Sequence, residues 1–182
     1  FKFTNEGSKI IYKDTNWTMK NILITGGAGY IGSILSTLLV EKKFNVTVLD
    51  NLSFSKTSLD HLLYNKNFNL IVGDTLNKKL LKSLIKKNEF IIPLASLVGA
   101  PLCAKKPVLA KKTNLDILSF ICENLTNKNK IIFPTSNSGY GIGIKGKYCD
   151  ETTPLNPISF YGKLKKDAEE IIRKKRNSIS FR

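Results

Sequence analysis

NILITGGAGYIG, residues 21–32, is the stretch that decides the fold of this chain. Residues 21–25 form an apolar, β-branched run of the kind found in buried strands, and the glycines after them predict a tight turn. A helical pattern follows from Tyr30 to Lys43, and a second strand-like run, NVTVL, occupies residues 45–49. A strand, a helix and a strand in this order predict two parallel strands joined by a crossover helix.

The same alternation continues along the rest of the chain. Further helices are predicted near 56–65, at 78–87, at 108–124 and from about 157 to 175, and further strands at 69–72, 90–94, 130–134 and from Ser178. Parallel strands need crossovers, and the crossover helices cover the sheet. The sequence therefore predicts an α/β fold, a Rossmann-type doubly wound parallel sheet with helices on both faces.

Length and hydropathy favour one soluble domain. The 182 residues are 42% hydrophobic, which is ordinary for a globular protein. The longest mostly apolar stretch, residues 90–104, is interrupted by Pro93, Gly99 and Pro101, and it is shorter than the roughly 20 residues of a transmembrane helix. Residues 1–18 lack the uninterrupted apolar segment of a secretory signal. We therefore expect a cytoplasmic protein.

The two ends of the chain predict an incomplete protein. Met19 stands directly before the first strand and resembles a natural start. We therefore expect residues 1–18 to be a leader or upstream extension without an assigned function, and residues 19–182 to be the dinucleotide-binding domain. The chain stops at Arg182, inside the last predicted strand. We expect the C-terminal substrate part to be missing, so that these residues form the cofactor half of a site and turn over no substrate.

The formal net charge of +15 admits a nucleic-acid-binding protein on the same fold, because basic surfaces neutralise phosphates. Only three of the 29 basic residues are arginine, and the lysines are scattered in pairs on predicted solvent faces. This pattern favours a compositional bias over a dedicated binding surface. The three cysteines are spaced too widely for a metal site, and their odd number argues against a disulfide framework. We predict no metal.

The glycine turn has both the pattern and the context of a dinucleotide-binding motif. Residues 26–32, GGAGYIG, satisfy G-x-x-G-x-x-G from Gly26 and G-x-G-x-x-G from Gly27, and they stand between a predicted strand and a predicted helix. Glycines permit a close approach of the backbone to a pyrophosphate, and the helix offers N–H groups and the positive end of its dipole. The predicted contacts in this turn are Gly26, Gly29, Tyr30, Ile31 and Gly32.

Two aspartates follow the next two strands. Asp50 closes the second strand, 18 residues beyond Gly32, where a carboxylate can accept hydrogen bonds from the adenosine ribose. A carboxylate would repel the 2′-phosphate of NADP, and residues 51–55 contain no arginine to receive it, so the sequence predicts NAD. Asp74 and Thr75, after the third strand, are placed for an adenine contact, although an aspartate there also suits a helix N-cap.

Ser136, Tyr161 and Lys165 are the predicted catalytic residues. Tyr161 and Lys165 are four residues apart in a predicted helix, which puts them on one face. The pKa of a free tyrosine is about 10, so a phenolate near neutral pH needs a shift of roughly three units, to which a neighbouring cation contributes. Ligands of open α/β sheets bind at the carboxyl edge. The candidates that the predicted topology brings to that edge are Ser136, the glycine turn, Asp50, Asp74 and Ala95.

From Met19 to Arg182 the chain resembles the extended short-chain dehydrogenase/reductases, in particular the NAD-dependent epimerase/dehydratase family. The resemblance rests on residues 25–32, 49–51, 73–74, 94–96, 114, 136–141, 154–157, 161 and 165. It implies that Tyr161 is the acid/base, that Lys165 binds the nicotinamide ribose and lowers the pKa of Tyr161, and that Ser136 orients the reacting hydroxyl. It also implies cofactor contacts at Asn51, Leu94, Ala95, Ser96 and Asn114.

The chain departs from the family pattern at a few positions. Pro93 stands where the family usually has His, and residues 117–118, Ile-Leu, replace its Gly-Thr, so packing near the cofactor is expected to differ. Residues 136–138 read Ser-Asn-Ser where the sugar 4,6-dehydratases have Thr-Asp-Glu, which argues against elimination of water. His61, in a predicted surface helix, is expected to be solvated and to have no role.

The resemblance implies an NAD-dependent sugar-nucleotide epimerase, which oxidises a sugar hydroxyl transiently and reduces the ketone again from its other face. A dehydrogenase or reductase of the same family, which releases the ketone, is the first alternative. A non-catalytic nucleic-acid-binding protein is the second. We expect a nucleotide-sugar substrate, whose sugar the sequence does not specify, no membrane partner, and a homodimer of the full-length protein.

Overall fold

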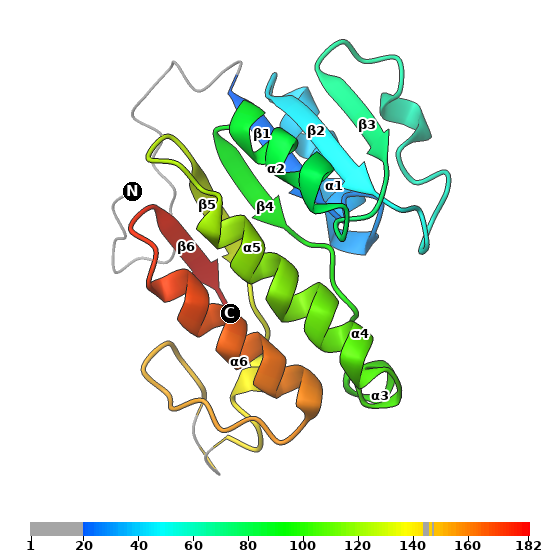
Figure 1. Ribbon diagram of the computed structural model, residues 1–182. Helices are drawn as coiled ribbons and strands as arrows, with labels where there is room; N and C mark the ends of the chain where they lie inside the picture. Colours follow the sequence, from blue (N-terminus) through cyan, green and yellow to red (C-terminus); the bar gives the residue numbers. More distant parts are fainter. Residues whose placement is uncertain (1–19, 144–145, 147) are drawn as a thin grey trace.

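The computed structural model describes residues 20–143, 146 and 148–182, and the leader predicted at residues 1–18 lies outside them. The described residues form a six-stranded sheet in the order β3-β2-β1-β4-β5-β6, and all neighbouring strands run parallel (Figure 1). The strands are β1 (Asn21–Thr25), β2 (Asn45–Asp50), β3 (Phe68–Val72), β4 (Phe90–Pro93), β5 (Lys130–Pro134) and β6 (Ser178–Phe181).

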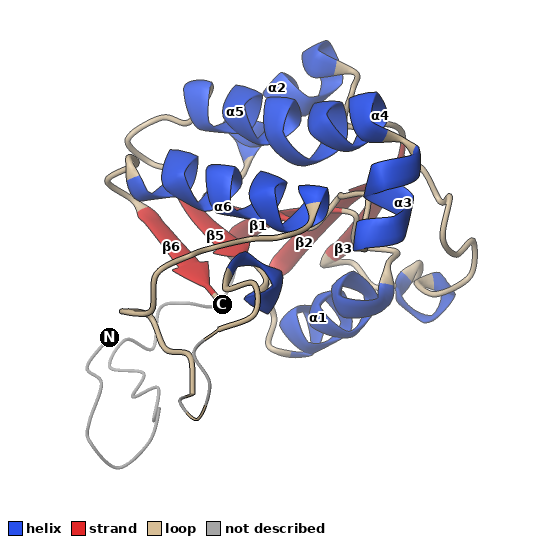
Figure 2. Ribbon diagram, turned by 90° about the horizontal axis from the view of Figure 1, so that it is seen from below, coloured by secondary structure: helices blue, strands red, loops and turns tan. Residues whose placement is uncertain are grey.

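Helices cover both faces of this sheet. Helix α1 lies on one face, and α2, α5 and α6 lie on the other (Figure 2). The helical elements are α1 (Tyr30–Glu41), η2 (Asp60–Leu62), α2 (Lys78–Lys87), α3 (Ala100–Lys105), α4 (Pro107–Lys111), η3 (Lys112–Asp116), α5 (Ile117–Glu123), η4 (Asn137–Gly139) and α6 (Phe160–Arg173). Within the described ranges, none of them combines the length and the apolar character needed to cross a bilayer. The predicted doubly wound Rossmann-type fold is confirmed.

The core consists of two apolar layers, one on each side of the sheet. Successive side chains of a strand point to opposite faces, and the central strands show this directly. Leu23 and Ile91 are fully buried against the α2, α5 and α6 layer, whereas Ile24 and Val48 are fully buried in the layer that includes Val40 of α1. Because both faces of the central strands are covered, buried apolar residues follow one another directly in them, such as Ile22, Leu23 and Ile24 of β1, as is usual in parallel strands of α/β proteins.

The prediction of a helix near residues 56–65 is wrong. The structure has only the short 3₁₀ turn η2 in this segment. Serine side chains hold this segment in place: Ser55 Oγ accepts from Ser58 N at 3.2 Å, and Ser58 Oγ donates to the carbonyl of Ala28 in the glycine turn at 2.8 Å. Leu59 and Leu62 are nevertheless buried. The spacing of the leucines therefore reflects their burial, although the segment that carries them is not a helix.

The helix predicted at 108–124 is shifted by one residue and is less regular than expected. It begins at Pro107, ends at Glu123, and contains the wider π turn η3 between α4 and α5. The separate helix α3 before it was not predicted, because Pro101 and Gly99 obscure the pattern. The last predicted helix, from about 157 to 175, begins three residues later than expected, because Ser159 Oγ caps it by accepting from Gly162 N at 3.0 Å.

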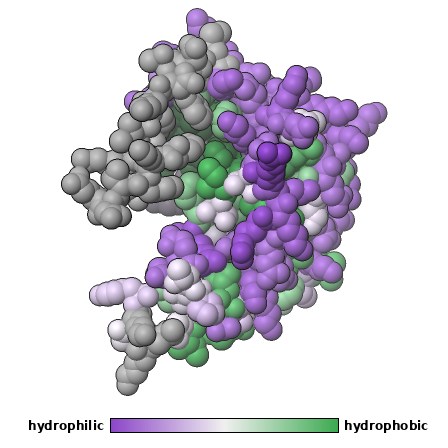
Figure 3. Space-filling view, turned by 90° about the vertical axis from the view of Figure 1, so that its left-hand side faces the viewer, coloured by the Kyte–Doolittle hydropathy of each residue, from purple (hydrophilic) through white to green (hydrophobic). Residues whose placement is uncertain are grey.

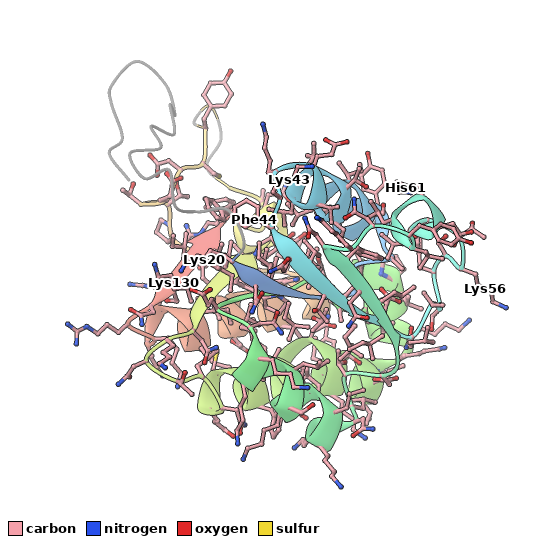
Figure 4. All side chains as sticks on the ribbon, turned by 90° about the horizontal axis from the view of Figure 1, so that it is seen from above. Lys20, Lys43, Phe44, Lys56, His61 and Lys130 are labelled. Atoms are coloured by element: carbon pink, nitrogen blue, oxygen red, sulfur yellow. The ribbon has the colours of Figure 1, made fainter. Side chains whose placement is uncertain are left out.

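Several lysines lie at the amino edge of the sheet, which Figure 4 views from above. Lys20 precedes β1, Lys43 lies just before β2, and Lys130 begins β5. Lys20 forms a salt bridge with Glu89, with 2.8 Å between Nζ and Oε2. These cations are therefore at the end of the strands opposite the predicted site. His61 is exposed as predicted, and its Nε2 lies 2.8 Å from Thr37 Oγ1 on α1.

Figure 3 views the side of the molecule on which β6 forms the edge of the sheet, where hydrophilic residues predominate and hydrophobic ones lie between them. Two apolar side chains of β6 are partly accessible: Ile179 is 41% exposed and Phe181 is 55% exposed. The described residues therefore cover β6 less completely than the central strands.

Candidate active site

The predicted site residues follow the strands at their carboxyl ends, and the topology brings them to one edge. Backbone hydrogen bonds continue the sheet beyond the strands: Gly26 N donates to the carbonyl of Leu49, and Leu94 N donates to the carbonyl of Thr25, both at 2.9 Å. The segments that leave β1, β2 and β4 therefore begin side by side. Asp74 follows β3 and Ser136 follows β5 at the same edge.

The glycine turn makes a very close backbone approach to the segment after β4. Gly26 has a φ of 73°, and a Cβ at this position would lie 2.5 Å from Ala95 N. A Cβ on Gly32 would lie 2.5 Å from the carbonyl oxygen of Gly26. The N–H groups in the first turn of a helix have no intrahelical acceptor. The N-cap of α1 is Gly29, which has no side chain to accept from them. The turn is a backbone cradle that suits an anion.

The carboxylate of Asp50 is fixed at the end of β2 by two backbone donors. Its Oδ2 accepts from Ala28 N in the glycine turn at 2.8 Å, and its Oδ1 accepts from Leu52 N at 2.7 Å. Asn51 Nδ2 donates to Asp74 Oδ2 at 3.3 Å, so the segments after β2 and β3 meet. Three of the predicted contacts, Asp50, Asn51 and Asp74, thus form one polar strip beside the glycine turn.

The remaining predicted cofactor positions differ in what their side chains do. Tyr30 and Ile31 open α1 with side chains that are 77% and 59% exposed, so their expected contribution rests on the backbone N–H groups of the first turn. Thr75 is 5% exposed and lies directly after Asp74 at the same edge. Ala95 and Ser96 belong to the segment after β4 that faces the glycine turn.

Asn114 anchors that segment. Its Oδ1 accepts from Leu97 N at 2.7 Å, and its Nδ2 donates to the carbonyl of Leu97 at 2.8 Å. The thiol of Cys103 on α3 donates to the same carbonyl at 3.2 Å. Asn114 lies in the π turn η3 and is buried. Its side chain therefore holds the segment after β4 through the backbone of Leu97. The predicted direct contact of Asn114 with a cofactor stays a prediction.

Ser136 is the N-cap of η4, which packs against α6. Its Oγ accepts from Ser138 N at 3.2 Å and lies 3.1 Å from Ser138 Oγ, to which it donates. Ser136 is also close enough to Tyr161 for its side chain to lower the pKa of the phenol. Gly162 makes this arrangement possible, because a Cβ there would lie 2.6 Å from the carbonyl oxygen of Ser138. The sequence analysis did not single out Gly162, although it stands next to Tyr161.

Tyr161 and Lys165 occupy the same buried face of α6, as their spacing predicts. They are 9% and 8% exposed, and Lys165 Nζ lies 5.9 Å from the centroid of the Tyr161 ring. Burial raises the pKa of Tyr161, and the neighbouring side chain of Ser136 opposes that rise. Burial lowers the pKa of Lys165 to about 8, against a smaller opposing effect of the Cys103 sulfur. The protein chain alone therefore does not lower the pKa of Tyr161, contrary to the expectation for a phenolate base.

Two neighbours of Lys165 were not predicted. Cys103 is fully buried in a cluster with Tyr161 and Leu164. Burial raises its pKa, and Lys165 lowers it. Phe133 on β5 presents its ring to Lys165, with 5.1 Å between Nζ and the ring centroid. All three cysteines are free. Among the described residues no group of His, Cys, Asp or Glu side chains is arranged to hold a metal ion.

A parallel sheet with a glycine turn, a fixed aspartate at the end of β2 and a Ser, Tyr and Lys group at one edge defines a dinucleotide-binding domain of the short-chain dehydrogenase/reductase class. The model of the family described as GDP-mannose 4,6 dehydratase matches residues 23–181. The chain belongs to this family of NAD-dependent epimerases and dehydratases.

Comparisons with individual proteins agree with this family assignment. A UDP-glucose 4-epimerase of Erwinia amylovora is 32% identical over 161 residues, which are 84% of this chain and 48% of that protein. The structure of the UDP-Glc/GlcNAc 4-epimerase of Campylobacter jejuni superposes with a TM-score of 0.78 at 30% identity, covering 85% of this chain and 48% of that one. The UDP-glucose 4-epimerase of Brucella ovis, solved in complex with NAD, gives a TM-score of 0.77 at 25% identity over 88% and 50% of the two chains. The chain spans about half the length of these relatives.

Proposed function

We propose that this chain is the cofactor-binding part of an NAD-dependent nucleotide-sugar epimerase. The observation that carries the proposal is the meeting of Ser136, Tyr161 and Lys165 at the same sheet edge as the glycine turn and the Asp50 carboxylate. The relatives named above supply the substrate class, since they act on UDP-sugars by name.

The residues fit NAD. Backbone N–H groups of the glycine turn and of the first turn of α1 would hold the pyrophosphate, and the fixed carboxylate of Asp50 would accept hydrogen bonds from the adenosine ribose. Lys165 would hold the nicotinamide ribose, as the family resemblance implies. When bound, NAD supplies a hydride acceptor and, in its reduced form, a hydride donor.

The protein's own part of the reaction is proton transfer and orientation. Tyr161 Oη takes the proton of a sugar hydroxyl while the carbon that bears this hydroxyl is oxidised to a ketone. It returns the proton when the ketone is reduced from its other face. Ser136 orients that hydroxyl. Burial raises the pKa of Tyr161, so the phenolate depends on nearby positive charge, which the Lys165 ammonium and the nicotinamide ring supply.

A dehydratase is the less favoured reading of the family match. Residues 137 and 138 are Asn and Ser, and neither is a carboxylic acid that could remove water. A dehydrogenase that releases the ketone remains the alternative. The two are separated by adding a UDP-sugar to the whole protein and following the absorbance of NADH. We expect conversion of the sugar without net NADH, because a closed cycle returns the hydride. Steady accumulation of NADH would assign the protein to the alternative.

We predict that the protein binds NAD at least roughly tenfold more tightly than NADP, about 1.4 kcal/mol or more, because Asp50 repels a 2′-phosphate. Asp50→Ala should narrow this gap, as measured by calorimetry with both cofactors. Asp60→Ala, which removes an exposed carboxylate on η2, is the matched control and should leave the gap unchanged. Equal affinities in the parent protein would remove Asp50 from the explanation.

A further inference from the structure

Lys165 is a buried cation that faces aromatic rings where a buried lysine would usually meet a carboxylate. It is 8% exposed, and its Nζ lies 5.1 Å from the centroid of the Phe133 ring and 5.9 Å from that of Tyr161. The carboxylate one turn further along α6, Glu169, is engaged elsewhere: Arg182 Nη2 and Nε both donate to its Oε1, at 2.7 Å and 3.0 Å. Lys165 therefore depends on other groups for its stabilisation.

The other elements around Lys165 supply few alternatives. The small cavity that Lys165 helps to line, at the carboxyl ends of β1, β4 and β5, has Thr25, Ser96, Thr113 and Asn114 as its other polar lining residues, and no Asp or Glu. The titratable groups that act on Lys165 or share its cluster are the thiol of Cys103 from α3 and the phenol of Tyr161 from α6. Both are neutral at neutral pH, since burial raises the pKa of each.

Phe133 is well placed to take the role of a counter-charge. It is 3% exposed, it lies on β5 three residues before Ser136, and the same strand therefore fixes the ring and leads to the catalytic hydroxyl. The face of an aromatic ring carries negative partial charge, and a cation over it gains most where water is excluded. No hydrogen of Phe133 can be donated to or taken from a substrate, so its effect on chemistry must pass through Lys165.

We propose that Phe133 is a positioning residue, whose ring face holds the Lys165 ammonium charged and directed at the catalytic edge beside Tyr161. The inference deepens the proposed function and rests on it for the catalytic role of Lys165. The contact itself predicts a direction: the ring stabilises the charged form, so it raises the pKa of Lys165 against the effect of burial. Weakening the ring's negative face should make Lys165 lose its proton at lower pH.

The test replaces Phe133 by pentafluorophenylalanine, which keeps the shape of the ring nearly unchanged and removes the negative charge of its face. The pKa of Lys165 is measured in the whole protein from the ¹³Cε signal during a pH titration, and the signal is assigned by its loss in Lys165→Arg. Starting from about 8, the pKa should fall by roughly one pH unit, the shift that corresponds to a desolvated cation–π contact. The readout needs neither cofactor nor turnover.

The matched control places the same amino acid at Phe68, a buried phenylalanine of β3 in the other core layer, and it should leave the titration of Lys165 unchanged. A pKa of Lys165 that stays constant or rises in the Phe133 variant overturns the proposal. If the pKa falls but the whole protein epimerises no sugar, the contact stands and the proposed function fails. If the protein is an active epimerase and the pKa does not move, only this inference fails.

Discussion

Tyr161→Phe is expected to lower the rate of sugar epimerisation by the whole protein by a factor of about 10² to 10⁴, the usual contribution of a positioned acid/base. The substitution removes only the hydroxyl. The ring would still pack with Cys103 and Leu164 in their buried cluster, so the fold and NAD binding should be retained. Initial rates at saturating sugar, together with calorimetric titration of NAD, measure the two properties separately.

Tyr64→Phe is the control for this experiment, because Tyr64 is 100% exposed and has no place in the site. It should epimerise at the parental rate. Epimerisation by Tyr161→Phe within a few-fold of the parent would show that the proton is transferred by another group. In that case Ser136, whose side chain acts on the pKa of Tyr161, would be the first residue to examine.

The fold was predictable because the local signals in the central strands agree with the burial that the sheet imposes. Residues 22–24 are apolar on both faces of β1 and the structure buries all three, and Val46, Val48 and Leu49 of β2 are buried as well. The segment 56–65 misled the prediction because periodic leucines are also compatible with an irregular chain that packs them. Ser58 bonds to the carbonyl of Ala28 in the glycine turn, 30 residues earlier in the chain, and nothing in the segment itself indicates that contact.

The site was predictable to the extent that it depends on topology. Strand ends on one edge determine where the glycine turn, Asp50 and Ser136 lie, and the four-residue spacing determines that Tyr161 and Lys165 share a face. Contacts across elements are not encoded in spacing. The approach of Phe133 to Lys165 and of Cys103 to the same cluster depends on how β5 and α3 pack against α6, and nothing in the linear order of these residues indicates it.

The pKa of Tyr161 illustrates the same limit. The sequence puts a lysine one turn away and so predicts a lowered pKa, but it does not show how completely the phenol is buried. Burial is the larger effect on Tyr161 in the folded chain and raises its pKa. Burial also lowers the pKa of Lys165 to about 8, so its ammonium group loses the proton at a lower pH than that of an exposed lysine. The electrostatics of the pair therefore follow from packing more than from spacing.

Gly26→Ala is expected to destabilise the domain by roughly 3 kcal/mol or more, because it combines a left-handed backbone with an overpacked contact. The new Cβ would lie 2.5 Å from Ala95 N and 2.6 Å from its Cα, and Gly26 has a φ of 73°. Backbone atoms cannot rotate away as a flexible side chain can. The turn and the segment after β4 must therefore separate, and NAD affinity should fall together with stability. Urea unfolding followed by circular dichroism gives the change in stability.

Gly29→Ala is the matched control in the same turn. A Cβ on Gly29 would meet only the carbonyl oxygen of Gly26, at 3.3 Å, and its φ of −76° is one that alanine adopts freely. We expect it to change stability by less than about 1 kcal/mol. If both variants unfolded at midpoints close to that of the parent, the backbone of the turn would be able to move away from Ala95 at little cost in stability. The close approach of Gly26 to Ala95 would then not be what requires glycine at this position.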